Sequence, residues 1–104
     1  LDYFVDFFNQ KRNIIYMDVQ GYEGIVLQGC PKIIDMKIPI ILEVWPYGLN
    51  RIDSQDILIK MVKKYTYLYN LSEKNPKKKS SVEIEEIINN LGRNSTRYVD
   101  ILIM

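Results

Sequence analysis

Two short apolar runs, each with one carboxylate near its end, constrain the fold of this chain most. The first run, Ile14 to Val19, carries Asp18, and the second, Ile38 to Trp45, carries Glu43. Continuous apolar strands are typical of a parallel sheet, and two such strands joined by a helical crossover form a βαβ unit. Ligands of these sheets bind at the carboxyl ends of the strands, so we expect both acids at a ligand site.

The remaining secondary structure is predicted from periodicity. Helices are predicted where apolar residues recur at helical spacing, and strands where they alternate with other residues. Three short helices are predicted at residues 1–8, 22–28 and 31–36. A fourth is capped by Asp53 or Ser54 and ends at Lys63 and Lys64. The last helix runs from a capping box formed by Ser80 and Glu83 to Gly92. The predicted strands are 14–19, 39–45, 65–71 and 98–104. Surface loops are predicted at residues 72–80 and where Pro46 and Gly48 end the second strand.

Composition excludes several classes of protein. A chain of 104 residues forms one domain at most. Fourteen basic and 13 acidic residues leave a net charge of +1, so neither nucleic acid nor a membrane surface is expected as a partner. The chain has no apolar stretch of the ~20 residues that a membrane span needs, and no secretory signal is recognised. A single cysteine, Cys30, excludes an internal disulfide and fits a cytoplasmic location.

The first apolar run continues into a distinctive pattern. Residues 16–29 read YMDVQGYEGIVLQG, and residues 39–44 read PIILEV. This pattern resembles the FkbM family of methyltransferases, which typically reads K-I-D-V-E-G-x-E-x-x-V-L-x-G and then P-x-x-L-x-E. The resemblance implies a class I fold that transfers a methyl group from S-adenosylmethionine, usually to a hydroxyl. Gln20 stands where the family usually has a second acid, and Tyr16 where a lysine is common.

The expected fold is α/β. The resemblance implies a partial Rossmann-like sheet, mostly parallel with an antiparallel final strand, and helices on both faces. The donor's cradle in such folds is a glycine-rich turn, but the five glycines of this chain form no G-x-G-x-x-G pattern. With leucine at position 1, this suggests that residues 1–104 are the carboxy-terminal half of the enzyme. Most of the S-adenosylmethionine site would then lie elsewhere, and the bare edge of strand 14–19 would favour a homo-oligomer.

Asp18 is the leading candidate for catalysis and donor binding. A carboxylate in an apolar strand needs a partner or an open position, because burying it unpaired costs several kcal/mol. From spacing alone, a structural carboxylate that accepts hydrogen bonds from the turn at residues 20–24 is an equal alternative. The resemblance favours the site, because methyltransferases of this class place an acid or amide beside the methyl donor, and it adds Gln20 to the donor contacts.

Glu23 and Glu43 are the other catalytic candidates. Two acids at the ends of neighbouring strands can share a proton, bind a cation or hold a substrate's hydroxyls. The alternatives are a first-turn acid that stabilises its helix for Glu23 and a partnered core charge for Glu43. The chain has no histidine, so a general base must be a carboxylate or a perturbed lysine or tyrosine. No metal-ligand set is predicted.

Trp45 and Tyr47 flank Pro46 just past Glu43. They are candidate substrate-binding residues, as a platform for a sugar ring or the donor's adenine. The alternative is an ordinary packed loop.

The sequence therefore predicts an S-adenosylmethionine-dependent O-methyltransferase. Its acceptor would be a small molecule or glycan: a sugar, a glycolipid or a secondary metabolite. The alternative is a non-catalytic α/β interaction domain derived from that fold. A third and weaker reading is a nucleic-acid binder that uses Lys77 to Lys79, for which a solvated loop is the simpler explanation.

Overall fold

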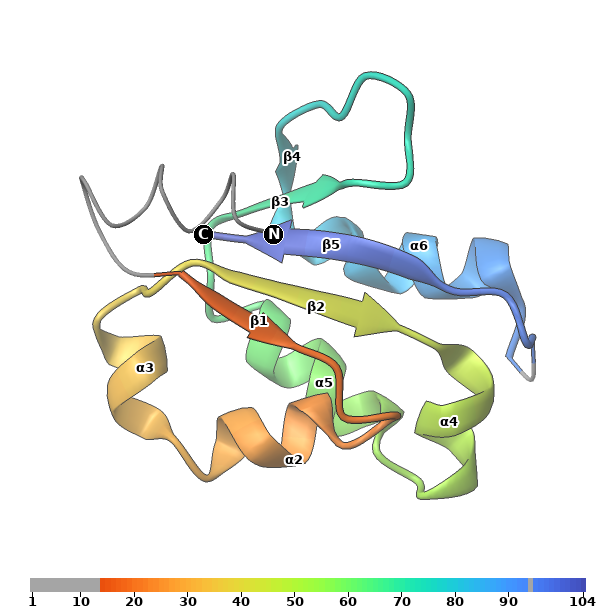
Figure 1. Ribbon diagram of the computed structural model, residues 1–104, viewed down its shortest axis with the longest axis horizontal. Helices are drawn as coiled ribbons and strands as arrows, with labels where there is room; N and C mark the ends of the chain where they lie inside the picture. Colours follow the sequence, from red (N-terminus) through yellow and green to blue (C-terminus); the bar gives the residue numbers. More distant parts are fainter. Residues whose placement is uncertain (1–13, 94) are drawn as a thin grey trace.

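The computed structural model describes residues 14–93 and 95–104, so the helix predicted over residues 1–8 lies outside the described part. The described chain alternates strands and helices (Figure 1). The strands are β1 (Ile15–Met17), β2 (Ile40–Val44), β3 (Tyr67–Asn70), β4 (Lys79–Ser80) and β5 (Val99–Ile103). The helices are α2 (Glu23–Gln28), α3 (Pro31–Asp35), α4 (Pro46–Arg51), α5 (Gln55–Val62), the 3₁₀ helix η1 (Ser81–Glu83) and α6 (Ile84–Leu91). The predicted α/β class is confirmed.

The five strands form one mixed sheet in the order β1-β2-β5-β3-β4. Only β1 and β2 pair in parallel, with Met17 opposite Leu42, and the other three neighbouring pairs are antiparallel. The prediction of a mostly parallel sheet is therefore wrong. The final strand, β5, is antiparallel as predicted, but it lies between β2 and β3. Because it has a neighbour on each side, this one reversed strand creates two antiparallel pairs.

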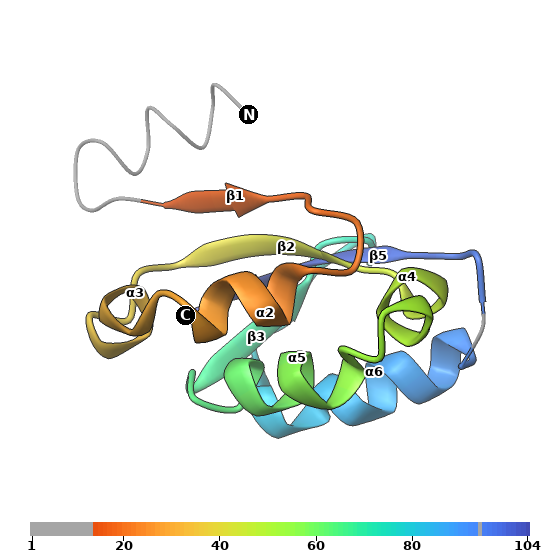
Figure 2. The same cartoon turned by 90° about the horizontal axis from the view of Figure 1, so that it is seen from below.

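All described helices lie on one side of the sheet (Figure 2). The strand residues facing that side join the helices in the core, which contains Met17, Leu27, Ile40, Leu42, Val44, Leu58, Leu68, Ile84, Ile101 and Ile103. The expectation of helices on both faces is wrong for the described residues. The opposite face of the sheet carries Tyr16, Glu43 and Asp100, which are exposed or half-buried, together with Ile41, which is buried.

The crossover from β1 to β2 contains two short helices. Pro31 occupies the first turn of α3, where its missing N–H costs nothing. Gly24 lets α2 approach α5 closely, since a Cβ there would lie 2.6 Å from the Leu58 backbone nitrogen. Helix α2 of the crossover therefore packs tightly against α5 beneath the sheet.

Several local predictions are confirmed and three are wrong. Neither Asp53 nor Ser54 caps α5 through its side chain, because the Ser54 hydroxyl donates to the Gly21 and Leu49 carbonyls instead. Ser80 and Glu83 form the predicted capping box, and Gly92, with φ of +95°, ends α6. The loop predicted at Pro46 and Gly48 is helix α4, because a proline at the first helical position initiates a helix. The two residues of β4 fall inside the predicted loop 72–80. No helix among the described residues is long and apolar enough to cross a membrane.

Candidate functional site

A tight turn follows β1 and connects it to α2. Its two central residues, Gln20 and Gly21, have φ of +55° and +100°, and the Tyr22 N–H donates to the Val19 carbonyl over 3.2 Å. Positive φ at both central positions is typical of a type I′ turn. A glutamine rarely adopts this conformation, so the surrounding structure must hold it there.

Glu23 holds this turn from inside. Its side chain is 1% exposed. One carboxylate oxygen accepts a hydrogen bond from the Val19 N–H and the other from the Gly21 N–H, each over 3.0 Å. The structural role considered for Asp18 thus belongs to Glu23. Glu23 was predicted as a catalytic residue, but both of its carboxylate oxygens accept hydrogen bonds from the turn.

The turn also packs against Gly48 in α4 and against Ser54, the residue that precedes α5. The Ser54 hydroxyl, fully buried, donates to the Gly21 carbonyl over 2.6 Å. A Cβ at Gly21 would lie 2.6 Å from the Gly48 carbonyl oxygen. The glycine of this turn therefore serves close packing against α4 and does not open a cradle for a ligand.

Asp18 and Gln20 project from the turn into solvent. The Gln20 side-chain amide donates to the Asp18 carboxylate over 3.0 Å, and both residues are exposed. The sequence predicted these two residues as donor contacts, and the fold brings them together at the carboxyl end of β1. A carboxylate and an amide side by side offer a ligand both an acceptor and further hydrogen-bonding groups.

A third acid joins Asp18 and Glu43. Glu43 lies directly opposite Asp100 in the β2–β5 ladder, and Asp18 follows Met17, which pairs with Leu42 next to Glu43. Three carboxyl groups therefore cross three adjacent strands in one row. Burial, followed by the charges of Asp18 and Asp100, raises the pKa of Glu43. Burial and the charge of Asp18 raise the pKa of Asp100.

Sequence reasoning missed Asp100, although a signal existed. Asp100 is the one charged residue in the apolar run 98–104, just as Asp18 and Glu43 are in theirs. Tyr16 lies on the same face as this row. The charge of Asp100, with smaller effects from burial and from Asp18 and Glu43, raises the pKa of its hydroxyl. Tyr16 therefore stays protonated and can only donate or accept as a neutral hydroxyl.

The fold also brings Trp45 and Tyr47 together. Their ring centroids are 5.5 Å apart and the rings are tilted by 47°. The Trp45 ring fills the space over Gly48, where a Cβ would lie 2.4 Å from it, whereas Tyr47 is exposed. Trp45 therefore acts first as packing for α4, and of the two rings it is Tyr47 that stays open to a ligand.

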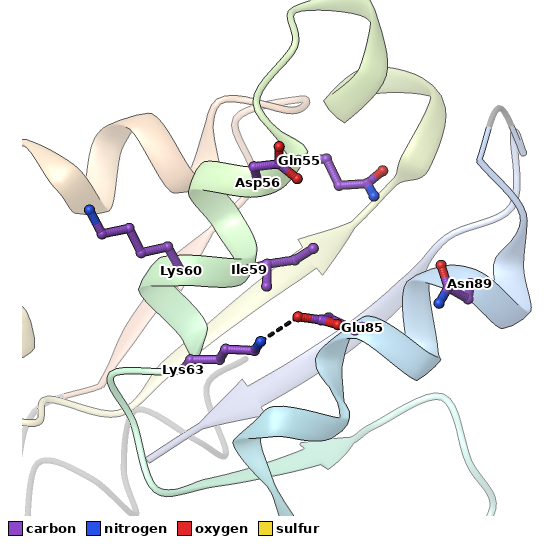
Figure 3. Close-up of a pocket in the computed structure, with 7 residues that line it drawn as sticks. All are labelled: Gln55, Asp56, Ile59, Lys60, Lys63, Glu85 and Asn89. Atoms are coloured by element: carbon purple, nitrogen blue, oxygen red, sulfur yellow. Dashed lines mark hydrogen bonds and ion pairs between the residues drawn. The ribbon is translucent and has the colours of Figure 1, made fainter.

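A cavity of about 510 Å³ lies elsewhere, in the groove between α5 and α6 (Figure 3). It is lined by charged side chains, among them Asp56 and Lys60 and the ion pair of Lys63 with Glu85. None of its lining residues belongs to the acid row. Among residues 14–93 and 95–104, no three histidine, cysteine, aspartate or glutamate side chains are placed to hold a metal ion.

No family model matches this chain, and neither the curated proteins nor the solved structures contain a significant match. The resemblance to the FkbM family therefore rests on the motif residues themselves. Within that motif the fold gives each residue a distinct position: Gly21, Glu23 and Gly24 lie inside the turn and the helix contact, and Asp18 and Gln20 lie outside it.

Proposed function

We propose that this chain is the carboxy-terminal half of an S-adenosylmethionine-dependent methyltransferase with a Rossmann-like class I fold. Its acceptor would be a hydroxyl group of a sugar, glycolipid or secondary metabolite. Support comes from the FkbM-like motif, from the parallel β1–β2 unit with its helical crossover, and from the antiparallel final strand.

One observation carries the proposal. The buried part of the motif builds a rigid turn, and that turn displays Asp18 and Gln20 at the carboxyl end of β1, one strand away from Glu43. The carboxyl ends of parallel strands are where ligands bind in open α/β sheets. The side chains of Asp18 and Gln20 are exposed and hydrogen-bonded to each other, so they are accessible to a ligand at this end of the sheet.

The residues present fit only part of the methyl donor. Asp18 and Gln20 can bind the polar amino-acid end of S-adenosylmethionine, but the turn at Gly21 is closed by α4 and offers no cradle for the nucleoside. The nucleoside contacts would come from residues outside the described part of this chain. When bound, the donor supplies an activated methyl group.

Glu43 is the best candidate for the general base. Its raised pKa brings it closer to neutrality than an ordinary carboxylate, which makes it a better proton acceptor for an acceptor hydroxyl. Asp100 lies directly opposite and shares the same face, so it can hold a second hydroxyl of a polyhydroxylated acceptor.

The test is transfer of labelled methyl from S-adenosylmethionine to a panel of sugar and glycolipid hydroxyls, using the protein that contains this chain. Asp18→Asn keeps the shape of the side chain and removes its charge. We expect at least about a tenfold loss of turnover, corresponding to about 1.4 kcal/mol of transition-state stabilisation, with little change in melting temperature. The matched control is Asp35→Asn, which changes an exposed carboxylate at the end of α3.

The two variants separate the outcomes. Equal activities of Asp18→Asn and Asp35→Asn would contradict a role for Asp18 in the reaction. Absence of transfer to any hydroxyl acceptor by the unaltered protein, with S-adenosylmethionine binding also absent, would favour the interaction domain instead.

A further inference from the structure

The cavity between α5 and α6 lies apart from the acid row. The described helices lie on one side of the sheet, whereas Glu43 and Asp100 lie on its other face (Figure 2). Helix α2 packs against α5 and lies beneath β1, so the cavity is also separate from the open edge of the sheet. Its volume of about 510 Å³ falls within the roughly 300–1,000 Å³ that is typical of small-molecule sites.

The charged side chains that line this cavity have partners or favourable positions of their own. Lys63 of α5 forms an ion pair with Glu85 of α6 across the groove (Figure 3). Lys60 extends the other way, toward α2, where it lines a second pocket beside Leu27. Asp56 lies in the first turn of α5, where the helix dipole favours an acid. The balance of two acids and two lysines therefore favours a ligand without net charge.

Two side-chain amides supply neutral hydrogen-bonding groups. Gln55 extends from the start of α5 toward α6, and Asn89 projects from α6 (Figure 3). The side-chain oxygen of Gln55 is buried and has no hydrogen-bond donor among residues 14–93 and 95–104. A buried acceptor without a donor costs about 1–3 kcal/mol, so a ligand that donates to it gains this amount. Ile59, half-buried on α5, adds a small apolar surface to the same lining.

We propose that this groove binds a neutral sugar. A hydroxyl group both donates and accepts hydrogen bonds, as an amide does, so neighbouring hydroxyls of one ring can bond to Gln55 and Asn89. The C–H groups of the ring would lie on Ile59. An apolar ligand would leave both amides without partners, and a charged ligand would have to compete with the Lys63–Glu85 ion pair.

Sugar binding here is independent of the proposed methyl transfer, because none of the lining residues belongs to the acid row. The experiment is proton–nitrogen NMR of the isotope-labelled 104-residue chain, titrated with methyl glucoside, methyl galactoside and maltose. The side-chain NH₂ groups of Gln55 and Asn89 report directly on the groove. We expect their signals to shift with a dissociation constant on the order of millimolar for at least one of these sugars.

Two alanine variants of neighbouring asparagines locate the site. Asn89→Ala removes one amide from the lining, and we expect the dissociation constant to rise by about tenfold or more. Asn90→Ala is the matched control, because Asn90 is the next residue of α6, is equally exposed and does not line the groove. Its dissociation constant should stay unchanged. Circular dichroism checks folding, and Gln55→Ala replaces Asn89→Ala should that variant not fold.

Three further ligands test the chemistry of the site. Glucuronate adds a negative charge, glucosamine adds a positive charge, and cyclohexanol keeps a ring with a single hydroxyl. Each should bind at least about tenfold more weakly than the best neutral sugar. The proposal would be overturned by unshifted amide signals at about 50 mM of every neutral sugar, by equal losses in both alanine variants, or by equal or tighter binding of any of these three ligands.

Discussion

Replacing Glu23 with glutamine tests whether this buried acid holds the turn after β1. The substitution keeps the size of the side chain and exchanges one carboxylate oxygen for an NH₂ group. In the wild-type protein the two oxygens accept from the Val19 and Gly21 N–H groups over 3.0 Å each. Glutamine has only one oxygen, so one of these N–H groups would face another donor.

The expected loss of stability follows from these two bonds. A hydrogen bond to a charged group contributes about 1.5–3 kcal/mol, and a buried donor left without a partner costs about 1–3 kcal/mol. Because Glu23 is 1% exposed, water cannot readily replace the lost acceptor. We expect Glu23→Gln to lower the free energy of unfolding by about 2–4 kcal/mol, a large part of the roughly 5–15 kcal/mol typical of a small domain.

The assay is urea unfolding, followed by the fluorescence of Trp45 and by circular dichroism. The melting temperature should fall by at least about 8 °C, taking about 4 °C per kcal/mol for a domain of this size. Glu86→Gln, an exposed change in the first turn of α6, is the control and should alter stability by less than about 0.5 kcal/mol. A Glu23→Gln protein as stable as this control would refute the reasoning. If it were also inactive, the original catalytic assignment of Glu23 would be restored.

Two further predictions concern packing and charge. Gly24→Ala should destabilise the protein by about 1–2 kcal/mol in urea unfolding, because the cost of overpacking against the Leu58 backbone exceeds the gain in helix propensity. The control is Gly29→Ala, which should be neutral or stabilising, because the nearest atom to an added Cβ there is 3.5 Å away. Because the pKa of Glu43 is raised, the folded state binds the proton of this carboxyl group more tightly than the unfolded state does. The stability that protonated Glu43 contributes is therefore present at low pH, and it is lost as the pH rises from about 4 through the raised pKa. Glu43→Gln should flatten that decline in unfolding measured against pH, and an equally steep decline would contradict the cause given.

The sequence alone determined four of the strands and the ends of the last helical segment. Apolar alternation located β1, β2, β3 and β5, since the period of a strand is two whatever its neighbours are. The capping box at Ser80 and the glycine at position 92 marked the ends of the last helical segment, because a cap is chosen by backbone groups within a few residues. The family-like motif likewise singled out Asp18 and Gln20 as candidates, and these two residues lie side by side at the turn after β1.

Only the tertiary structure decided which strands are neighbours. Periodicity tells which face a side chain occupies but not which strand lies beside it, and pairing depends on contacts between residues far apart in the chain. The insertion of β5 between β2 and β3 made the sheet mostly antiparallel and placed Asp100 opposite Glu43. The same long-range packing buried Glu23 under the turn and left Asp18 outside it, because a carboxylate's role is set by the backbone groups that the fold brings to it.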